Sequence, residues 1–188
     1  MTNEPPVQQG WRLHTEWQPI SKPALIAWTA CYGLFLLYAW RDRDGFLFID
    51  QVNLIVHEGG HLLFGWFGRT MGLWGGTLME LIVPAALAVY FALHRQTAAT
   101  AFAAFFFFEN FLYISVYMAD ARAQALPLVT VGDPEMGGHD WFQIFAQLGL
   151  LRSDRSIAAV VRGAGWLGML GTVGWLFYRF RRSAAGAG

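Results

Sequence analysis

The chain has 188 residues, of which 55% are hydrophobic and only 14% are charged. Water-soluble domains usually carry about 25% charged residues, so this composition indicates a membrane protein. The formal net charge is +0, which excludes the strong positive field that would recruit nucleic acid. The single cysteine, Cys31, excludes an internal disulfide and a thiolate metal cage.

The first 22 residues form a polar head without the apolar stretch of a signal peptide. We therefore expect the first apolar run to be retained as an anchor. Residues 23–182 are expected to form a single transmembrane helical domain, and residues 183–188 a flexible tail.

Five apolar stretches approach the length of a membrane span, which is roughly 20 residues for about 30 Å of hydrocarbon. They are residues 24–40, 46–68, 73–94, 99–120 and 157–178. A shorter apolar helix is expected over 141–151, at the interface or dipping inward. The turns between the first four stretches are short, which favours antiparallel neighbours. The predicted fold is all-α: a multi-pass bundle of about five transmembrane helices, integral to the cell membrane.

The second stretch contains the sequence HEGGH, from His57 to His61. On a helix, residues four apart lie on one face, so both imidazoles can reach one metal ion. Zinc accepts histidine nitrogens at about 2.0–2.1 Å, and a catalytic zinc site leaves one position for water. Glu58 lies beside this face, where it can take a proton from the water and pass it to a leaving amine. The motif therefore predicts metal-assisted hydrolysis.

The residues that precede the motif favour a metal site over a chance match. Asp50, Asn53, His57 and His61 follow one another at steps of three, four and four, which places them on a single helical stripe. Ionisable groups inside an apolar span are costly and tend to mark functional sites. The alternative is that the two imidazoles only join helices by hydrogen bonds, although Ser, Thr or Asn does this at lower cost.

Two histidines need at least one more protein ligand, and the candidates lie far along the chain. The sequence GGHDW places His139 and Asp140 just before an apolar helix, and its glycines give the backbone freedom to turn inward. His139 is one candidate for the third ligand. Asp140 is the other, although it can instead orient the His139 ring or cap the helix that follows.

The fourth apolar stretch carries a second polar stripe. Glu109, Tyr113 and Asp120 recur along it at steps of four and seven, with Asn110 and Tyr117 beside them. These groups predict either a hydrogen-bond network between helices, or contacts of Asn110 or Asp120 with metal or substrate. Asn110 or a tyrosine of this stretch can also donate a hydrogen bond to an oxyanion. Glu80, in the third stretch, raises the same question.

The HEGGH sequence, in an early span, resembles the motif of the site-2 protease family of intramembrane metalloproteases, which commonly reads H-E-x-G-H. Gly60 matches the glycine of that motif, and GGTLMELIVP at 75–84 is similar to the Gly-Gly and later Pro that follow it. The resemblance covers about residues 46–140. It implies that His57 and His61 bind zinc and that Glu58 is the general base. The family takes its third ligand from an aspartate on a later helix, in an Asn-Pro-x-Asp-Gly type motif that this chain lacks, and GGHDW stands in roughly that place.

The predicted function is an intramembrane zinc metallopeptidase, which hydrolyses a transmembrane or membrane-proximal peptide within the lipid bilayer. One alternative is a membrane metalloenzyme of another class, either a lipid or small-molecule hydrolase or an oxidoreductase. Glu58 and His61 form the Glu-x-x-His unit of di-iron bundles, but the sequence has no second unit. Another is a non-enzymatic protein in which zinc joins helices or subunits, closed by four ligands such as His57, His61, His139 and Asp120. The sequence predicts no nucleic-acid partner and is compatible with oligomers.

Overall fold

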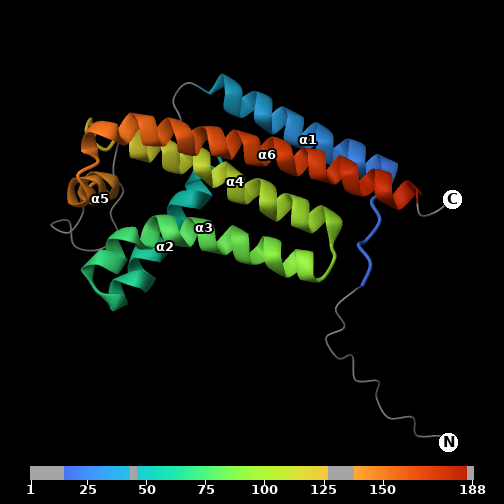
Figure 1. Cartoon of the computed structure of the whole chain (residues 1–188), viewed down its shortest axis with the longest axis horizontal. Coiled ribbons are helices and arrows are strands. Elements are labelled where there is room, and N and C mark those ends of the chain that lie inside the picture. Colours follow the sequence, from blue (N-terminus) through green and yellow to red (C-terminus); the bar gives the residue numbers. More distant parts are fainter. Residues whose placement is uncertain (1–14, 43–45, 127–137, 186–188) are drawn as a thin grey trace, which may run out of the picture.

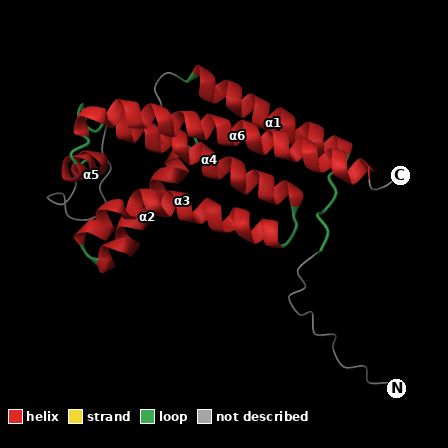
Figure 2. Ribbon diagram, in the orientation of Figure 1, coloured by secondary structure: helices red, strands yellow, loops and turns green. Residues whose placement is uncertain are grey.

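The computed structural model describes residues 15–42, 46–126 and 138–185 of the chain. These residues form helices and loops, and no strand occurs among them (Figure 2). The elements are α1 (Lys22–Arg41), α2 (Asp50–Phe64), the 3-10 turn η1 (Gly65–Phe67), α3 (Arg69–Leu93), α4 (Thr97–Ala119), α5 (Asp140–Leu148), the 3-10 turn η2 (Leu151–Ser153) and α6 (Asp154–Ala185). The predicted all-α class is confirmed. Most of the expected polar head, residues 1–14, lies outside the described residues, as do residues 186–188 of the expected tail.

Among the described residues, four helical stretches are long and apolar enough to cross a membrane: α1, α3, α4 and residues 151–185, which include η2 and α6. The prediction of about five spans is therefore close, and the difference lies in α2. This helix has 15 residues and measures about 22 Å at 1.5 Å per residue, less than about 30 Å of hydrocarbon. It stops because the chain tightens into η1 and reverses at Gly68, whose φ of 105° suits glycine.

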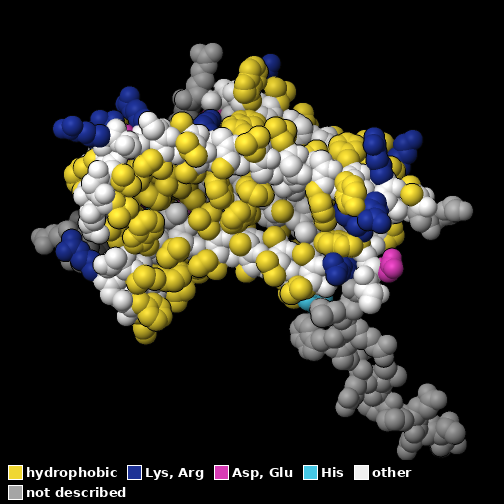
Figure 3. Space-filling model, in the orientation of Figure 1, with side chains coloured by type: hydrophobic (Ala, Val, Ile, Leu, Met, Phe, Trp, Pro, Cys, Tyr) yellow, Lys and Arg dark blue, Asp and Glu magenta, His cyan; other side chains and the backbone are white. Residues whose placement is uncertain are grey.

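The surface of the molecule agrees with this assignment. On the face drawn in Figure 3, hydrophobic side chains cover the middle of the long axis, whereas most of the Lys and Arg side chains gather toward its two ends. Large exposed side chains such as Trp40, Phe48, Ile55 and Leu167 are between 72% and 76% exposed. Exposed apolar surface on this scale is unusual for a soluble monomer and is consistent with a membrane protein.

Helix α4 is the centre of the bundle. It packs against α6 on one side and α3 on another, while α1 lies against α6 (Figure 1). In the most apolar part of α4, 56% of the residues are buried, compared with 17–22% in the corresponding parts of the other three stretches. The main core joins α1, α4 and α6 through side chains that include Tyr32, Phe105 and Met169.

Helix α2 packs closely against α3 because glycines meet at their contact. A Cβ atom added at Gly60 would lie 2.7 Å from the carbonyl carbon of Gly75, and one added at Gly75 would lie 2.8 Å from Cβ of Phe64. Both distances are shorter than ordinary carbon contacts of about 3.5–4.0 Å. The glycines therefore set the separation of the two helices at the level of the HEGGH motif.

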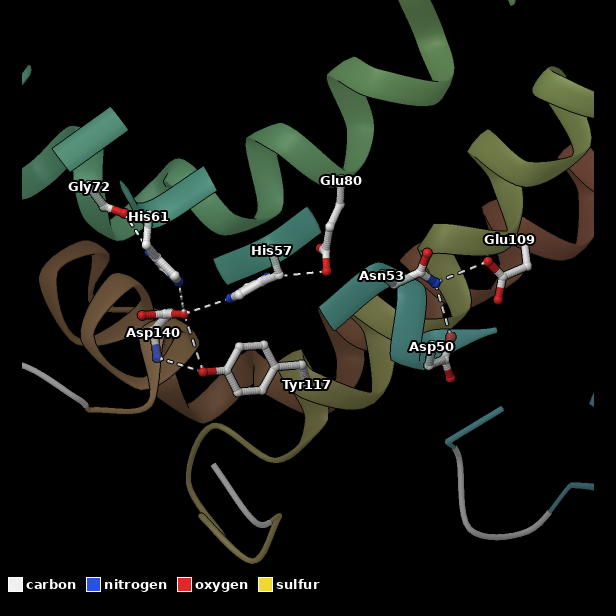
Figure 4. Close-up of polar contacts among 9 residues, drawn as sticks. All are labelled: Asp50, Asn53, His57, His61, Gly72, Glu80, Glu109, Tyr117 and Asp140. Carbon is white, nitrogen blue, oxygen red and sulfur yellow. Dashed lines mark hydrogen bonds and ion pairs between the residues drawn. The ribbon is translucent and has the colours of Figure 1, made fainter. Parts of the chain in front are cut away.

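Helix α5 is held to the end of the bundle by a second core. Trp141, Ile144 and Phe145 of α5 are buried with Ile114 and Met118 of α4. The helix ends at Gly149, which has a φ of 70°. This packing places the first residue of α5 beside the C-terminal half of α4 and next to the end of α2 (Figure 4).

Candidate metal centre

One face of α2 is polar and buried. Asp50 and Asn53 are each 1% exposed and His57 is 3% exposed, whereas Ile55 on the opposite side is 74% exposed. His61, one turn after His57, is half-buried, with 26% of its side chain exposed. The stripe expected from the sequence spacing therefore exists, and it faces α3, α4 and α5.

Both imidazoles of the motif meet a single carboxylate oxygen (Figure 4). Nε2 of His57 and Nε2 of His61 each lie 3.1 Å from Oδ2 of Asp140. Asp140 is the first residue of α5 and stands 79 positions after His61. Two nitrogens from one helix and one oxygen from another therefore converge on the same point.

The second nitrogen of each imidazole also has a partner. Nδ1 of His61 lies 2.7 Å from the carbonyl oxygen of Gly72, and Nδ1 of His57 lies 3.2 Å from Oε1 of Glu80, at ion-pair distance. A carbonyl only accepts, so Nδ1 of His61 must carry the hydrogen. The neutral ring then keeps its Nε2 lone pair for a metal, which is the usual outer-shell arrangement of metal-binding histidines.

The spacing of these three donors suits a metal ion. Donor atoms of His57, His61 and Asp140 all lie within 4.8 Å of one another. With bonds of about 2.0 Å, the edge of a zinc tetrahedron is about 3.3 Å, close to the 3.1 Å between each imidazole and Asp140. Within the described ranges, no fourth His, Cys, Asp or Glu joins the group. The arrangement can therefore take three protein ligands and leave a position for water.

Tyr117 of α4 fixes the position of Asp140. Its hydroxyl accepts a hydrogen bond from the backbone N–H of Asp140 at 3.1 Å and donates one to Oδ2 at 3.3 Å. Burial alone would raise the pKa of Asp140, but positively charged, protonated rings of His57 and His61 lower it to about 2, and a bound cation in place of their protons would act in the same direction. The carboxylate therefore stays charged at neutral pH, as a metal ligand must.

His139 lies outside this group of three donors. Its Nδ1 accepts a hydrogen bond from the backbone N–H of Phe142 at 3.3 Å, so the ring caps α5. Its Nε2 lies 3.3 Å from Oδ2 of Asp120. The centroid of its ring lies 4.3 Å from the centroid of the Tyr117 ring. Both ring nitrogens are therefore engaged elsewhere. The capping role that the sequence allowed for Asp140 is taken by His139, and Asp140 joins the imidazoles.

The other predicted site residues lie at different distances from the centre. Asp120 accepts hydrogen bonds from the backbone N–H groups of Ala125 and Leu126, which ties down the chain after α4. Asn110 is 1% exposed, and its amide donates 2.8 Å to the carbonyl oxygen of Phe106 within α4. Glu58 is half-buried and makes no hydrogen bond to any residue that the structure describes.

Sequence reasoning did not find the outer partners of the imidazoles. Glu80 could be noticed as a charge inside an apolar stretch, but only the packing of α3 on α2 shows that it serves His57. The carbonyl of Gly72 leaves no trace in the sequence, because every residue has one. Comparison with known proteins adds nothing to this geometry: no family model, curated protein or solved structure matches the chain.

Proposed function

We propose that the protein is a multi-pass membrane metallopeptidase of the site-2 protease type, with zinc held by His57, His61 and Asp140. One observation carries the proposal: the two HEGGH imidazoles and a carboxylate from a distant helix meet at 3.1 Å. Two histidines and a carboxylate are a ligand set of known zinc hydrolases. Bound zinc would supply a Lewis acid and lower the pKa of a water molecule.

The residues around the zinc position then have separate roles. Glu58 takes the proton of the attacking water and returns it to the leaving amine. Its freedom from hydrogen bonds to other described residues suits this transfer. The Tyr117 hydroxyl sits beside the ligand oxygen of Asp140 and donates its one hydrogen to it at 3.3 Å. If that hydrogen turns from Asp140 to the oxygen of the attacked carbonyl, it stabilises the negative charge that develops there. Glu80 and the carbonyl of Gly72 keep the imidazoles in the tautomer that binds metal.

The alternatives raised by the sequence receive less support. A purely structural zinc site is closed by four protein ligands, but His139 and Asp120 pair with each other rather than with the group of three. A di-iron centre needs two glutamates and two Glu-x-x-His units. Glu80 and Glu109 lie near the stripe, yet the described residues contain only one such unit, in HEGGH.

The surroundings of the site favour a peptide substrate that reaches it from the bilayer. The exposed side of His61 adjoins the apolar end of α2, where Leu62 and Leu63 are more than half exposed. The end of α2 leads through η1 into the first turn of α3, one of the candidate membrane-crossing helices, so His61 lies near one end of that helix. A transmembrane or membrane-proximal peptide can meet the metal there.

The test is cleavage of a membrane peptide library by the purified chain in detergent or lipid nanodiscs. Wild-type protein loaded with zinc should cleave at least one peptide. Glu58→Gln should keep zinc and lose cleavage by a factor of about 10² or more, because general acid–base catalysis contributes typically 10²–10⁴. If Glu58→Gln cleaves as fast as wild type, the proposed mechanism is wrong.

A further inference from the structure

A second polar centre lies in the same bundle and takes no part in the metal chemistry. It consists of Asp50 and Asn53 on α2 and Glu109 in the middle of α4, and each of these residues is 1% exposed (Figure 4). The amide nitrogen of Asn53 donates two hydrogen bonds, each 3.1 Å long, one to Oδ1 of Asp50 and one to Oε2 of Glu109. One amide group therefore bridges two carboxyl groups in the interior of the bundle.

The hydrogen-bond inventory of this centre is incomplete. The backbone N–H of Leu47 donates 2.6 Å to Oδ2 of Asp50, so three of the four carboxyl oxygens each face an N–H donor. The fourth, Oε1 of Glu109, has no hydrogen-bond partner among the described residues, and neither has Oδ1 of Asn53. The two unpartnered atoms therefore belong to Glu109 and Asn53, whose side chains are joined by a hydrogen bond.

The charges around the centre are mostly negative. Each of the two carboxyl groups lies close enough to feel the charge of the other. Asp42 at the end of α1 and Glu80 on α3 add negative charge, and Tyr113 of α4 contributes a neutral hydroxyl. Among the described residues that line the cavity beside Asp50, the positive one is Arg162 of α6. One guanidinium cannot balance two ionised carboxylates in an apolar interior.

We propose that Asp50, Asn53 and Glu109 form a proton-binding site, in which the pair of carboxyl groups carries one proton in total. The proton sits on Oε1 of Glu109, the one oxygen without a donor, and leaves the pair with a single negative charge. Two interacting carboxyl groups that share one proton are a known way to relieve like-charge repulsion. The inference does not depend on the metal or the peptidase activity.

The structure also gives the proton a route to solvent. The cavity beside Asp50 has a volume of about 10 Å³ and is lined by residues that include Asp42, Leu47 and Arg162. This is about the space of one water molecule. Asp42 and Arg162 are only half-buried, so a single water there connects Asp50 to groups at the surface. Loss of the proton would set two negative charges against each other at the junction of α2 and α4, about two turns before His57.

Infrared spectroscopy of the full chain in nanodiscs tests the proposal, because a protonated carboxylic acid has its own carbonyl stretch. We expect such a band at neutral pH, its loss as pH rises, and its absence in Glu109→Gln. Glu80→Gln should keep the band, which shows that it does not come from Glu80. Glu16→Gln, at an exposed position, serves as the matched control and should leave the spectrum unchanged.

Three results would overturn the proposal. One is the absence of any protonated-acid band in Glu80→Gln at neutral pH, a variant that leaves Asp50, Asn53 and Glu109 in place. Another is a band that survives both Glu109→Gln and Asp50→Asn in folded protein. The last is a band that vanishes when sodium chloride replaces choline chloride at constant pH, which would assign the centre to a metal cation instead.

Discussion

The two glycines inside HEGGH should respond in opposite ways to the same substitution. In Gly60→Ala, the new Cβ would lie 2.7 Å from the carbonyl carbon of Gly75 and 2.7 Å from Cβ of Met79. Carbon atoms pack at about 3.5–4.0 Å, so α2 and α3 must separate by about 1 Å. Overpacking of this kind costs about 1–3 kcal/mol, of which better helix propensity offsets about 1 kcal/mol.

The same movement reaches the metal ligands. His57 lies 3.2 Å from Glu80 on α3, and a shift of about 1 Å breaks that contact. Loss of an outer partner typically lowers metal affinity by about 10–100-fold, so we expect Gly60→Ala to show both a lower melting temperature and weaker zinc binding.

Gly59→Ala is the matched control, because a Cβ at Gly59 meets no atom within 4 Å. We expect its zinc affinity to equal that of wild type and its stability to be unchanged or up to about 1 kcal/mol higher. The assay is thermal unfolding and zinc titration of both variants in the same detergent. Equal behaviour of the two variants would refute the close contact between α2 and α3.

Two further predictions concern the partners of the ligands. Glu80→Gln keeps the shape of the side chain but removes its charge beside His57, so zinc affinity measured by chelator competition should fall by about 10–100-fold; unchanged affinity would remove Glu80 from the site. Tyr117→Phe removes the hydroxyl that contacts both the carboxylate and the backbone N–H of Asp140. It should lower kcat by about 10-fold or more while one zinc remains bound, and an unaltered kcat would exclude an oxyanion role.

The sequence predicted most of the helices because their signal is local. Runs of apolar residues gave α1, α3, α4 and α6 with ends shifted by a few residues. The prediction was wrong in treating 46–68 as one full-length span. Composition could not show that α2 ends at Phe64, because Gly65 and Gly68 act through backbone conformation rather than hydropathy.

The site was harder to predict because its ligands come from two helices that are far apart in the sequence, α2 and α5. The spacing of Asp50, Asn53, His57 and His61 was enough to predict the polar face of α2. Either His139 or Asp140 could cap α5, and either could bind the metal. The sequence is the same in both cases, so it does not show which residue takes which role. Only the packing of Trp141 and Ile144 against α4 turns Asp140 toward the imidazoles.

The central claim is that one metal ion is bound by two histidines of α2 and the first residue of α5. Zinc titration with X-ray absorption at the zinc edge tests it most directly. We expect one ion per chain, with two nitrogen ligands and oxygen ligands at about 2.0–2.2 Å. Asp140→Ala should lose the ion, and His139→Ala should retain it. The opposite result for these two variants, or an ion closed by four protein ligands, would contradict the account.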